Sequence, residues 1–201
     1  MIAIALSLAS ALAAPVESPP PSNVRIVARG VIEAWTRDPA LDEVFGHGGP
    51  FGALGVVVPV AGPAALSIEG SYGRFFAGDD PAGAALVLTP VSLMAEIQLG
   101  EPEVQGYVDL GLSFVSFAEE GGASGTRVMG ELRGGVRINT GLIVPSMAPA
   151  PSPVRALELE LSGGRRVRSP GRLNRYGDEP EALTGFNFNA WQLVVGLGVR
   201  L

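Results

Sequence analysis

The sequence predicts an all-β protein, an antiparallel up-and-down barrel of about eight strands, and three observations carry this prediction. Apolar residues recur with a period of two along most of the chain, which is the period of a β-strand. Gly accounts for 28 and Pro for 17 of the 201 residues, and both residue types weaken helix interiors. The alternating segments are also longer than the roughly five or six residues usual in soluble sheets, which favours long barrel strands.

Of the first four predicted strands, the first, third and fourth have one apolar parity, whereas the second is apolar on both parities. They centre on residues 24–34, 54–60, 66–72 and 92–99. Their charged residues, all on the polar parity, are Arg25, Arg29, Glu33, Glu69 and Glu96.

The last four predicted strands repeat the same alternation. They centre on residues 107–114, 127–138, 157–162 and 191–201. Their polar parity carries Asp109, Arg127, Glu131, Arg133, Arg137, Glu158, Glu160 and Arg200, and Arg166 and Arg168 follow beyond residue 162.

Composition excludes several kinds of chemistry. The chain has no Cys and one His, so disulfides, thiol catalysis and a His-rich metal site are absent, and we expect no cofactor. The formal net charge of −6 is not the electrostatic footprint of a nucleic-acid-binding protein.

The N-terminus predicts a secretory signal. Residues 1–14 are apolar and end in small residues, with an Ala-x-Ala site at residues 11–13, so we expect cleavage after Ala13 or Ala14. A membrane-spanning helix needs about 20 apolar residues, and this segment is shorter. Residues 15–22 form a Pro-rich tether, and the barrel is expected to occupy residues 23–201. The alternative is a short N-terminal helix buried in the fold.

The direction in which each parity faces decides between a soluble and a membrane barrel. The apolar parity is nearly free of charge, as lipid contact requires, while the polar parity mixes both signs with many Gly and Ser residues. All basic residues are Arg, which pairs carboxylates bidentately and suits buried ion pairs. We therefore predict a transmembrane barrel with Leu110, Leu132, Leu159 and Leu197 outward near mid-depth. Its predicted lumen charge network is Arg29, Glu33, Glu69, Glu96, Asp109, Glu131, Arg133, Arg137, Glu158, Glu160 and Arg200.

The C-terminal segment 190–201 carries a resemblance to a known family. It alternates strictly, and over residues 23–201 the chain resembles the small eight-stranded outer-membrane β-barrel proteins, the OmpA-like and OmpX-like group. The resemblance implies location in the cell outer membrane of a Gram-negative envelope. It also implies partners: the lipid bilayer, lipopolysaccharide, the outer-membrane assembly machinery and a surface partner bound through the loops. The predicted assembly signal is Trp191, Leu193, Val195, Leu197, Val199 and Leu201. An aromatic girdle is expected from Trp35, Tyr72, Phe114, Phe117, Phe186, Phe188 and Trp191.

The expected function is a structural or surface-interaction role for a closed barrel with a charge-filled lumen. Eight strands leave an interior that side chains can fill. The alternatives are a narrow channel for ions or small solutes and a soluble lipocalin-like binder of an apolar ligand. We do not expect an enzyme, although His47 in a Gly-rich loop leaves room for a lipid-modifying activity. Paired acids at Asp79-Asp80 and Glu119-Glu120 could bind a divalent cation, and the Arg165–Arg168 cluster could bind lipopolysaccharide phosphates.

Overall fold

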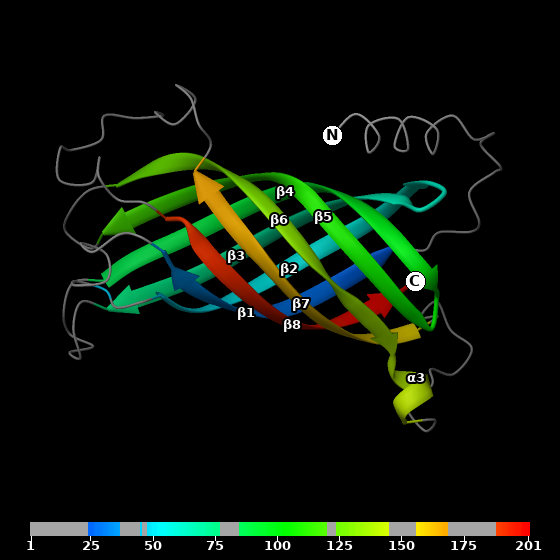
Figure 1. Ribbon diagram of the computed structural model, residues 1–201. Helices are drawn as coiled ribbons and strands as arrows, with labels where there is room; N and C mark the ends of the chain where they lie inside the picture. Colours follow the sequence, from blue (N-terminus) through cyan, green and yellow to red (C-terminus); the bar gives the residue numbers. More distant parts are fainter. Residues whose placement is uncertain are drawn as a thin grey trace.

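A closed antiparallel barrel makes up the described part of the protein. The computed structural model describes residues 24–36, 45, 48–76, 85–119, 124–144, 156–168 and 188–201. Each strand pairs with the next along the chain and β8 pairs with β1 (Figure 1). The strands are β1 (Arg25–Trp35), β2 (Gly48–Ala61), β3 (Ala64–Phe76), β4 (Ala85–Glu101), β5 (Val104–Glu119), β6 (Ser124–Asn139), β7 (Ala156–Arg168) and β8 (Ala190–Arg200). The predicted all-β, eight-stranded, up-and-down barrel is confirmed.

Closure is complete along the seam between β1 and β8. The register runs without a break from Arg25 opposite Arg200 to Trp35 opposite Ala190. A closed sheet has no edge strand with unpaired backbone groups, and this is the condition for a sheet to cross a membrane.

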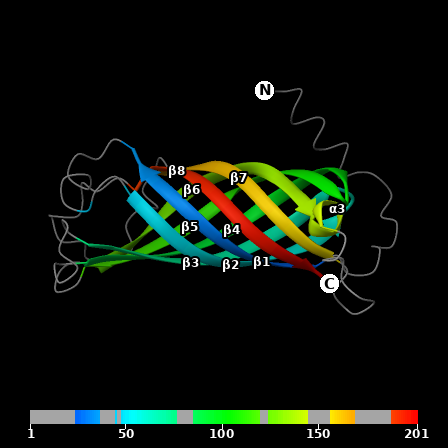
Figure 2. The same cartoon turned by 90° about the horizontal axis from the view of Figure 1, so that it is seen from below.

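The two ends of the barrel differ, and we name them the turn end and the loop end. The turn end holds the tight connections 61–64 and 101–104, the C-terminus and the short helix α3 (Thr140–Ile143), as Figure 2 shows from a second side. The Asn139 side chain caps α3 by accepting a hydrogen bond from the Gly141 N–H at 2.9 Å. The loop end is where β1, β3, β5 and β7 finish. In the described residues, no helix is long and apolar enough to span a membrane.

Most strands extend beyond the predicted segments, among them β2 and β4. β2 begins at Gly48, and β4 begins at Ala85 and contains Pro90. Pro90 has no N–H to donate, and the β3–β4 pairing is accordingly interrupted between the Gly70–Val91 and Gly73–Leu88 pairs. The Ser71 hydroxyl partly compensates by donating to the Pro90 carbonyl at 3.4 Å.

The apolar side chains of this barrel point outward and its charged side chains point inward, which is the reverse of a soluble barrel. Leu110, Leu132, Leu159 and Leu197 point outward and are 38–64% exposed, while the charged parity points inward and is buried. In water, a wall of exposed leucines around a charged interior would be strongly unfavourable, whereas in a bilayer it is the expected arrangement. The structure therefore confirms the transmembrane facing and contradicts the soluble-binder alternative.

An Arg placed on the outer wall tests this facing. Leu110 lies in the middle of β5 and is 64% exposed, so Leu110→Arg should cost about 2–4 kcal/mol of folding free energy in a bilayer. Leu99 is similarly exposed but lies two residues from the end of β4, where the cost should fall to about 0–1 kcal/mol. Equilibrium unfolding in urea from lipid vesicles measures both values. Equal costs for the two variants would contradict the depth assigned to Leu110.

Candidate functional site

The lumen holds a continuous chain of ion pairs in its middle and turn-end portions. Cations and carboxylates alternate along it, so every member except the two ends touches two oppositely charged neighbours. The order along the chain is Glu33, Arg166, Glu131, Arg133, Glu69, Arg29, Glu160, Arg137, Glu96, Arg25, Glu158 and Arg200. All twelve side chains are buried.

Glu160 and Arg29 lie at the centre of this chain. Arg29 donates to Glu160 from Nε at 2.6 Å and from Nη2 at 3.0 Å, which is a bidentate pair, and it also donates to Glu69. Glu160 accepts two further hydrogen bonds, from Arg137 Nε at 3.0 Å and from the Tyr107 hydroxyl at 2.8 Å. These contacts join β1, β3, β5, β6 and β7 across the inside of the barrel.

Toward the turn end, the network is built from Arg137, Glu96 and their neighbours. Arg137 holds Glu96 bidentately, at 2.6 and 2.7 Å, and its guanidinium carbon lies 3.8 Å from the centre of the Tyr107 ring. Arg200 and Arg25 both contact Glu158, the latter at 3.1 Å. These pairs tie the last strand to the first, at the seam that closes the barrel.

Toward the loop end, the network finishes at Glu33. Arg166 contacts Glu33 at 2.7 Å, and the Gln192 amide donates to the same carboxylate at 2.8 Å. Next along the chain, Glu131 accepts hydrogen bonds from Arg133 at 2.7 Å and from the Ser92 hydroxyl at 2.9 Å.

Acidic and basic side chains are equally numerous in the described lumen. It holds seven buried Arg side chains and seven buried carboxyl groups, and twelve of these fourteen groups belong to the ion-pair chain. The carboxylates are Glu33, Glu69, Glu96, Asp109, Glu131, Glu158 and Glu160, and the cations are Arg25, Arg29, Arg127, Arg133, Arg137, Arg166 and Arg200. Because an unpaired charge in such a space is costly, this arrangement favours a filled interior over an open aqueous pore.

The residues predicted for the lumen are all found inside it. Ten of the eleven belong to the ion-pair chain, and the eleventh, Asp109, is fully buried opposite Glu96 and Arg133 in the strand register. The predicted network omitted Arg25 and Arg166, which complete the chain, and the neutral partners Tyr107 and Gln192. Their positions on the polar parity were the signal that could have placed them there.

An apolar plug, which the sequence analysis missed, fills the lumen at the loop end. Aromatic rings pack against one another there, with centroid distances of 4.8 Å for Trp35–Phe75, 5.1 Å for Phe51–Phe75 and 5.4 Å for Phe117–Phe188. Gly73 makes room, because a Cβ at that position would lie 2.6 Å from the Phe51 ring. The plug residues are Val31, Trp35, Phe45, Phe51, Ala53, Phe75, Leu86, Leu88, Val115, Phe117, Met129, Phe188, Ala190 and Val194.

This plug corrects part of the predicted aromatic girdle. Trp35, Phe117 and Phe188 were expected at the membrane interface but are buried inside the barrel. Their parity is that of the inward-facing charges, and parity alone determines facing. Tyr72, Phe114 and Trp191 do point outward and are about half exposed. Phe186 lies outside the described residues.

Several other predicted features lie outside the described part of the chain. They are the signal segment 1–14, the tether 15–22, His47, Asp79-Asp80 and Glu120. The roles assigned to them stay predictions. In the predicted assembly strand, Trp191, Leu193, Val195 and Leu197 point outward from β8, and Val199 and Leu201 are half-buried.

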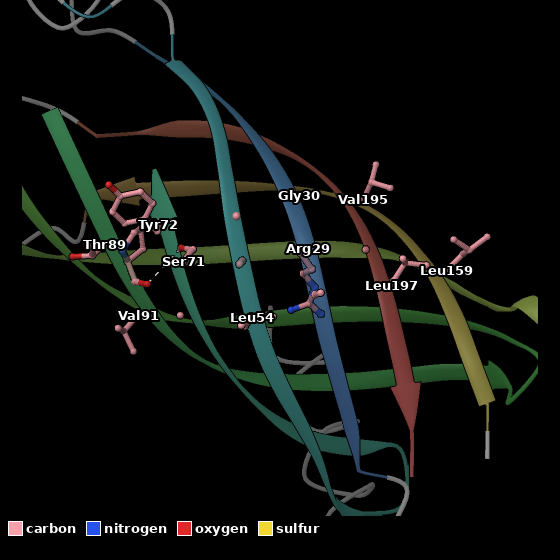
Figure 3. A pocket seen from close by; sticks show the side chains of 16 residues that line it. Arg29, Gly30, Leu54, Ser71, Tyr72, Thr89, Val91, Leu159, Val195 and Leu197 are labelled. Carbon is pink, nitrogen blue, oxygen red and sulfur yellow. Dashed lines mark hydrogen bonds between the residues drawn. The ribbon is translucent and has the colours of Figure 1, made fainter. Parts of the chain in front are cut away.

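A shallow hollow lies on the outer wall rather than in the lumen (Figure 3). It has a volume of about 890 Å³, and its floor is made by small residues of β1, β2 and β3, including Gly30, Gly52 and Gly70. The side chains of Leu54 and Tyr72 also line it. The hollow faces outward at the level of the apolar wall, so in a bilayer it would be in contact with lipid.

The fold and its interior define the class of protein as a small, closed transmembrane β-barrel with a charged lumen. Comparison with one solved structure supports the fold. The chain is similar to neisserial surface protein A (NspA), with 14% identity and a TM-score of 0.56 over 90% of this chain and 97% of that one. It also aligns with the N-terminal barrel of OprF from Pseudomonas aeruginosa, at 12% identity and a TM-score of 0.48 over 90% of this chain and 99% of that one. Ail from Yersinia pestis aligns at 13% identity and a TM-score of 0.47 over 90% of this chain and 99% of that one. No family model and no curated protein sequence matches the chain.

Proposed function

We propose that the chain is an integral outer-membrane protein that serves a structural or surface-interaction role and does not conduct. One observation carries this proposal: the barrel presents an almost uncharged apolar wall outside and buried charges, most of them ion-paired, inside. Such a barrel is stable only in a bilayer, and bilayer-spanning barrels of this kind belong to outer membranes. The fold shared with NspA is consistent with this location.

A closed lumen separates this proposal from the channel alternative. The ion-pair chain as a whole joins six strands across the lumen, and the loop-end portion is filled by the apolar plug. A conducting path would need both portions to open, with the loss of paired charges in one and apolar contacts in the other.

Two further roles belong to this proposal. The first is secretion through the signal at residues 1–14, which would give the chain access to the outer membrane. The second is recognition of β8 by the assembly machinery, through the outward row Trp191, Leu193, Val195 and Leu197. Removal of β8 should then abolish insertion without reducing synthesis or secretion of the chain.

Fractionation and conductance test the proposal together. The full chain expressed in a Gram-negative host should sediment with outer membranes and show a folded gel band that shifts on heating. The same folded protein in a planar bilayer should give no conductance steps, because both portions of the lumen are filled. Recovery in a soluble fraction would refute the membrane role. Regular conductance steps from the folded band would favour the channel instead.

A further inference from the structure

Three consecutive apolar side chains are exposed at the turn end without belonging to the barrel wall. Leu142, Ile143 and Val144 are 56%, 55% and 40% exposed. Every other large apolar side chain that is exposed in the described residues lies on a strand, as part of the outer wall. We name these three residues the apolar run. Closure of the barrel does not account for them, and exposed apolar clusters of this kind mark surfaces that meet a partner or a membrane.

The apolar run lies beside the barrel wall, level with the turn end. α3 follows β6 directly, and Figure 1 shows it outside the outline of the barrel, while Figure 2 confirms that it does not project beyond the turn end. Two hydrogen bonds hold the start of the segment against its neighbours. The Thr140 hydroxyl donates to the Leu157 carbonyl at 3.1 Å, and the Asn139 N–H donates to the Glu103 carbonyl at 2.8 Å. The apolar run therefore has a defined height on the barrel.

The outer surface changes from apolar to charged at this same end. Leu99 and Val104 point outward beside the 101–104 turn and are 57% and 49% exposed, while Glu101 and Glu103 in that turn are exposed acids. On β6, the outward parity stays apolar as far as Ile138, two residues before α3. In a bilayer, the border between hydrocarbon and headgroups therefore falls at the turn end, which is where the apolar run lies.

Charge and backbone bonding both suit the segment to this border. The sequence has no charged residue from position 138 to position 154. A segment outside a sheet can enter an apolar environment only where its backbone N–H groups have partners. The Gly141 N–H donates to Asn139 Oδ1 at 2.9 Å, and the Val144 N–H donates to the Thr140 carbonyl at 2.8 Å. The short helix thus presents its apolar side chains with these donors already satisfied.

We propose that Leu142, Ile143 and Val144 insert between the headgroups of the periplasmic leaflet and anchor the barrel from one side. The inference rests on the proposed outer-membrane function, with the turn end in the periplasm. A lipid surface fits better than a protein partner because the apolar run continues the wall that lipid already covers. A second copy fits less well, since a stable protein interface takes about 20–30 residues a side. Inserted beside β6 and β7 only, the anchor opposes both tilting and vertical movement of the barrel.

Single Cys variants test the anchor directly, because the chain has no Cys of its own. Leu142→Cys and, as the matched control at the same end, Glu101→Cys are each labelled with an NBD fluorophore in the folded protein. The labelled proteins are placed in phosphatidylcholine nanodiscs with and without lipids that carry a spin label near the headgroup. We expect the spin-labelled lipids to quench the label at position 142 about threefold more strongly than the label at position 101. If Leu142→Cys does not fold, Ile143→Cys supplies the same measurement.

A second set of variants shows whether the apolar side chains hold the segment in the lipid. The label is placed at Val144→Cys, and Leu142 and Ile143 are both replaced by Glu or, as the control, both by Met. The Glu pair should bring quenching at position 144 down to the level of the label at position 101, because two carboxylates favour water over the headgroup boundary. The Met pair should keep it. Both variants should still give the folded, heat-shifted band, since the replaced side chains are exposed.

Three results would speak against the anchor. Equal quenching at positions 142 and 101, or unchanged quenching at position 144 in the Glu pair, overturns it while the proposed function stands. Shielding of the position 142 label from aqueous iodide only in nanodiscs that hold two chains would assign the apolar run to a second copy and overturn the anchor as well. A chain that never gives the folded, heat-shifted band refutes the proposed function, and the anchor with it.

Discussion

Glu160→Ala is expected to destabilise the barrel by about 3–5 kcal/mol, because it removes the most connected carboxylate of the lumen. Glu160 accepts hydrogen bonds from Arg29, Arg137 and Tyr107 at distances of 2.6–3.0 Å. Without it, two guanidinium groups and a phenol lose partners in a space that water does not readily reach. Each guanidinium keeps one carboxylate, Glu69 or Glu96, and this limits the loss.

Equilibrium unfolding in urea from lipid vesicles, followed by the heat-dependent gel shift, measures the effect. Glu101→Ala serves as the control, since Glu101 is exposed at the turn end and its loss should change stability by about 0.5 kcal/mol or less. A loss below about 1 kcal/mol for Glu160→Ala would mean that the lumen is hydrated. A hydrated lumen would contradict a closed, non-conducting interior.

The alternation of the sequence was enough to predict the barrel and the facing of its charges. A strand places successive side chains on opposite faces, so one correctly phased residue fixes the facing of a whole strand. For this reason the eleven charged residues named from the sequence could be placed inside before any strand pairing was known. The partner of each charge could not be predicted in the same way. Arg29 and Glu160 are 131 positions apart and meet only because closure of the barrel places β1 and β7 on the two sides of β8, with both side chains pointing into a narrow lumen.

The apolar plug shows where residue type misled the prediction of facing and parity did not. Trp35 and Phe117 were assigned to the outer girdle because aromatic residues are common at membrane interfaces. The inward parity is charged toward the turn end but becomes aromatic toward the loop end, as on β1, where Arg25, Arg29 and Glu33 are followed by Trp35. Had parity been weighed above residue type, both rings would have been placed inside. The outward Arg side chains at positions 74 and 165 follow the same rule, since each lies on the apolar parity of its strand.

Gly111→Ala is expected to cost about 4 kcal/mol or more and to prevent the barrel from closing. Gly111 lies on the inward parity of β5, opposite Met94 of β4 and Glu131 of β6. A Cβ at this position would lie 2.1 Å from the Leu93 carbonyl oxygen and 2.7 Å from the Met94 Cα. Both atoms belong to the backbone of the neighbouring strand, which cannot move aside without breaking the β4–β5 ladder. The requirement comes from this close approach, and it could not be read from a sequence with 28 Gly residues.

Gly52→Ala is the matched control, because a Cβ at Gly52 on the outer wall would meet no atom within 4 Å. That variant should fold as the wild type does, or gain about 0.5–1 kcal/mol, since Gly in a strand interior is itself destabilising. Refolding yield in lipid vesicles, read from the heat-shifted gel band, compares the two variants directly. Efficient folding of Gly111→Ala would show that β5 can move away from β4. The ion pairs of Glu96 and Glu131, on the strands that flank β5, would then be less rigidly held than the register indicates.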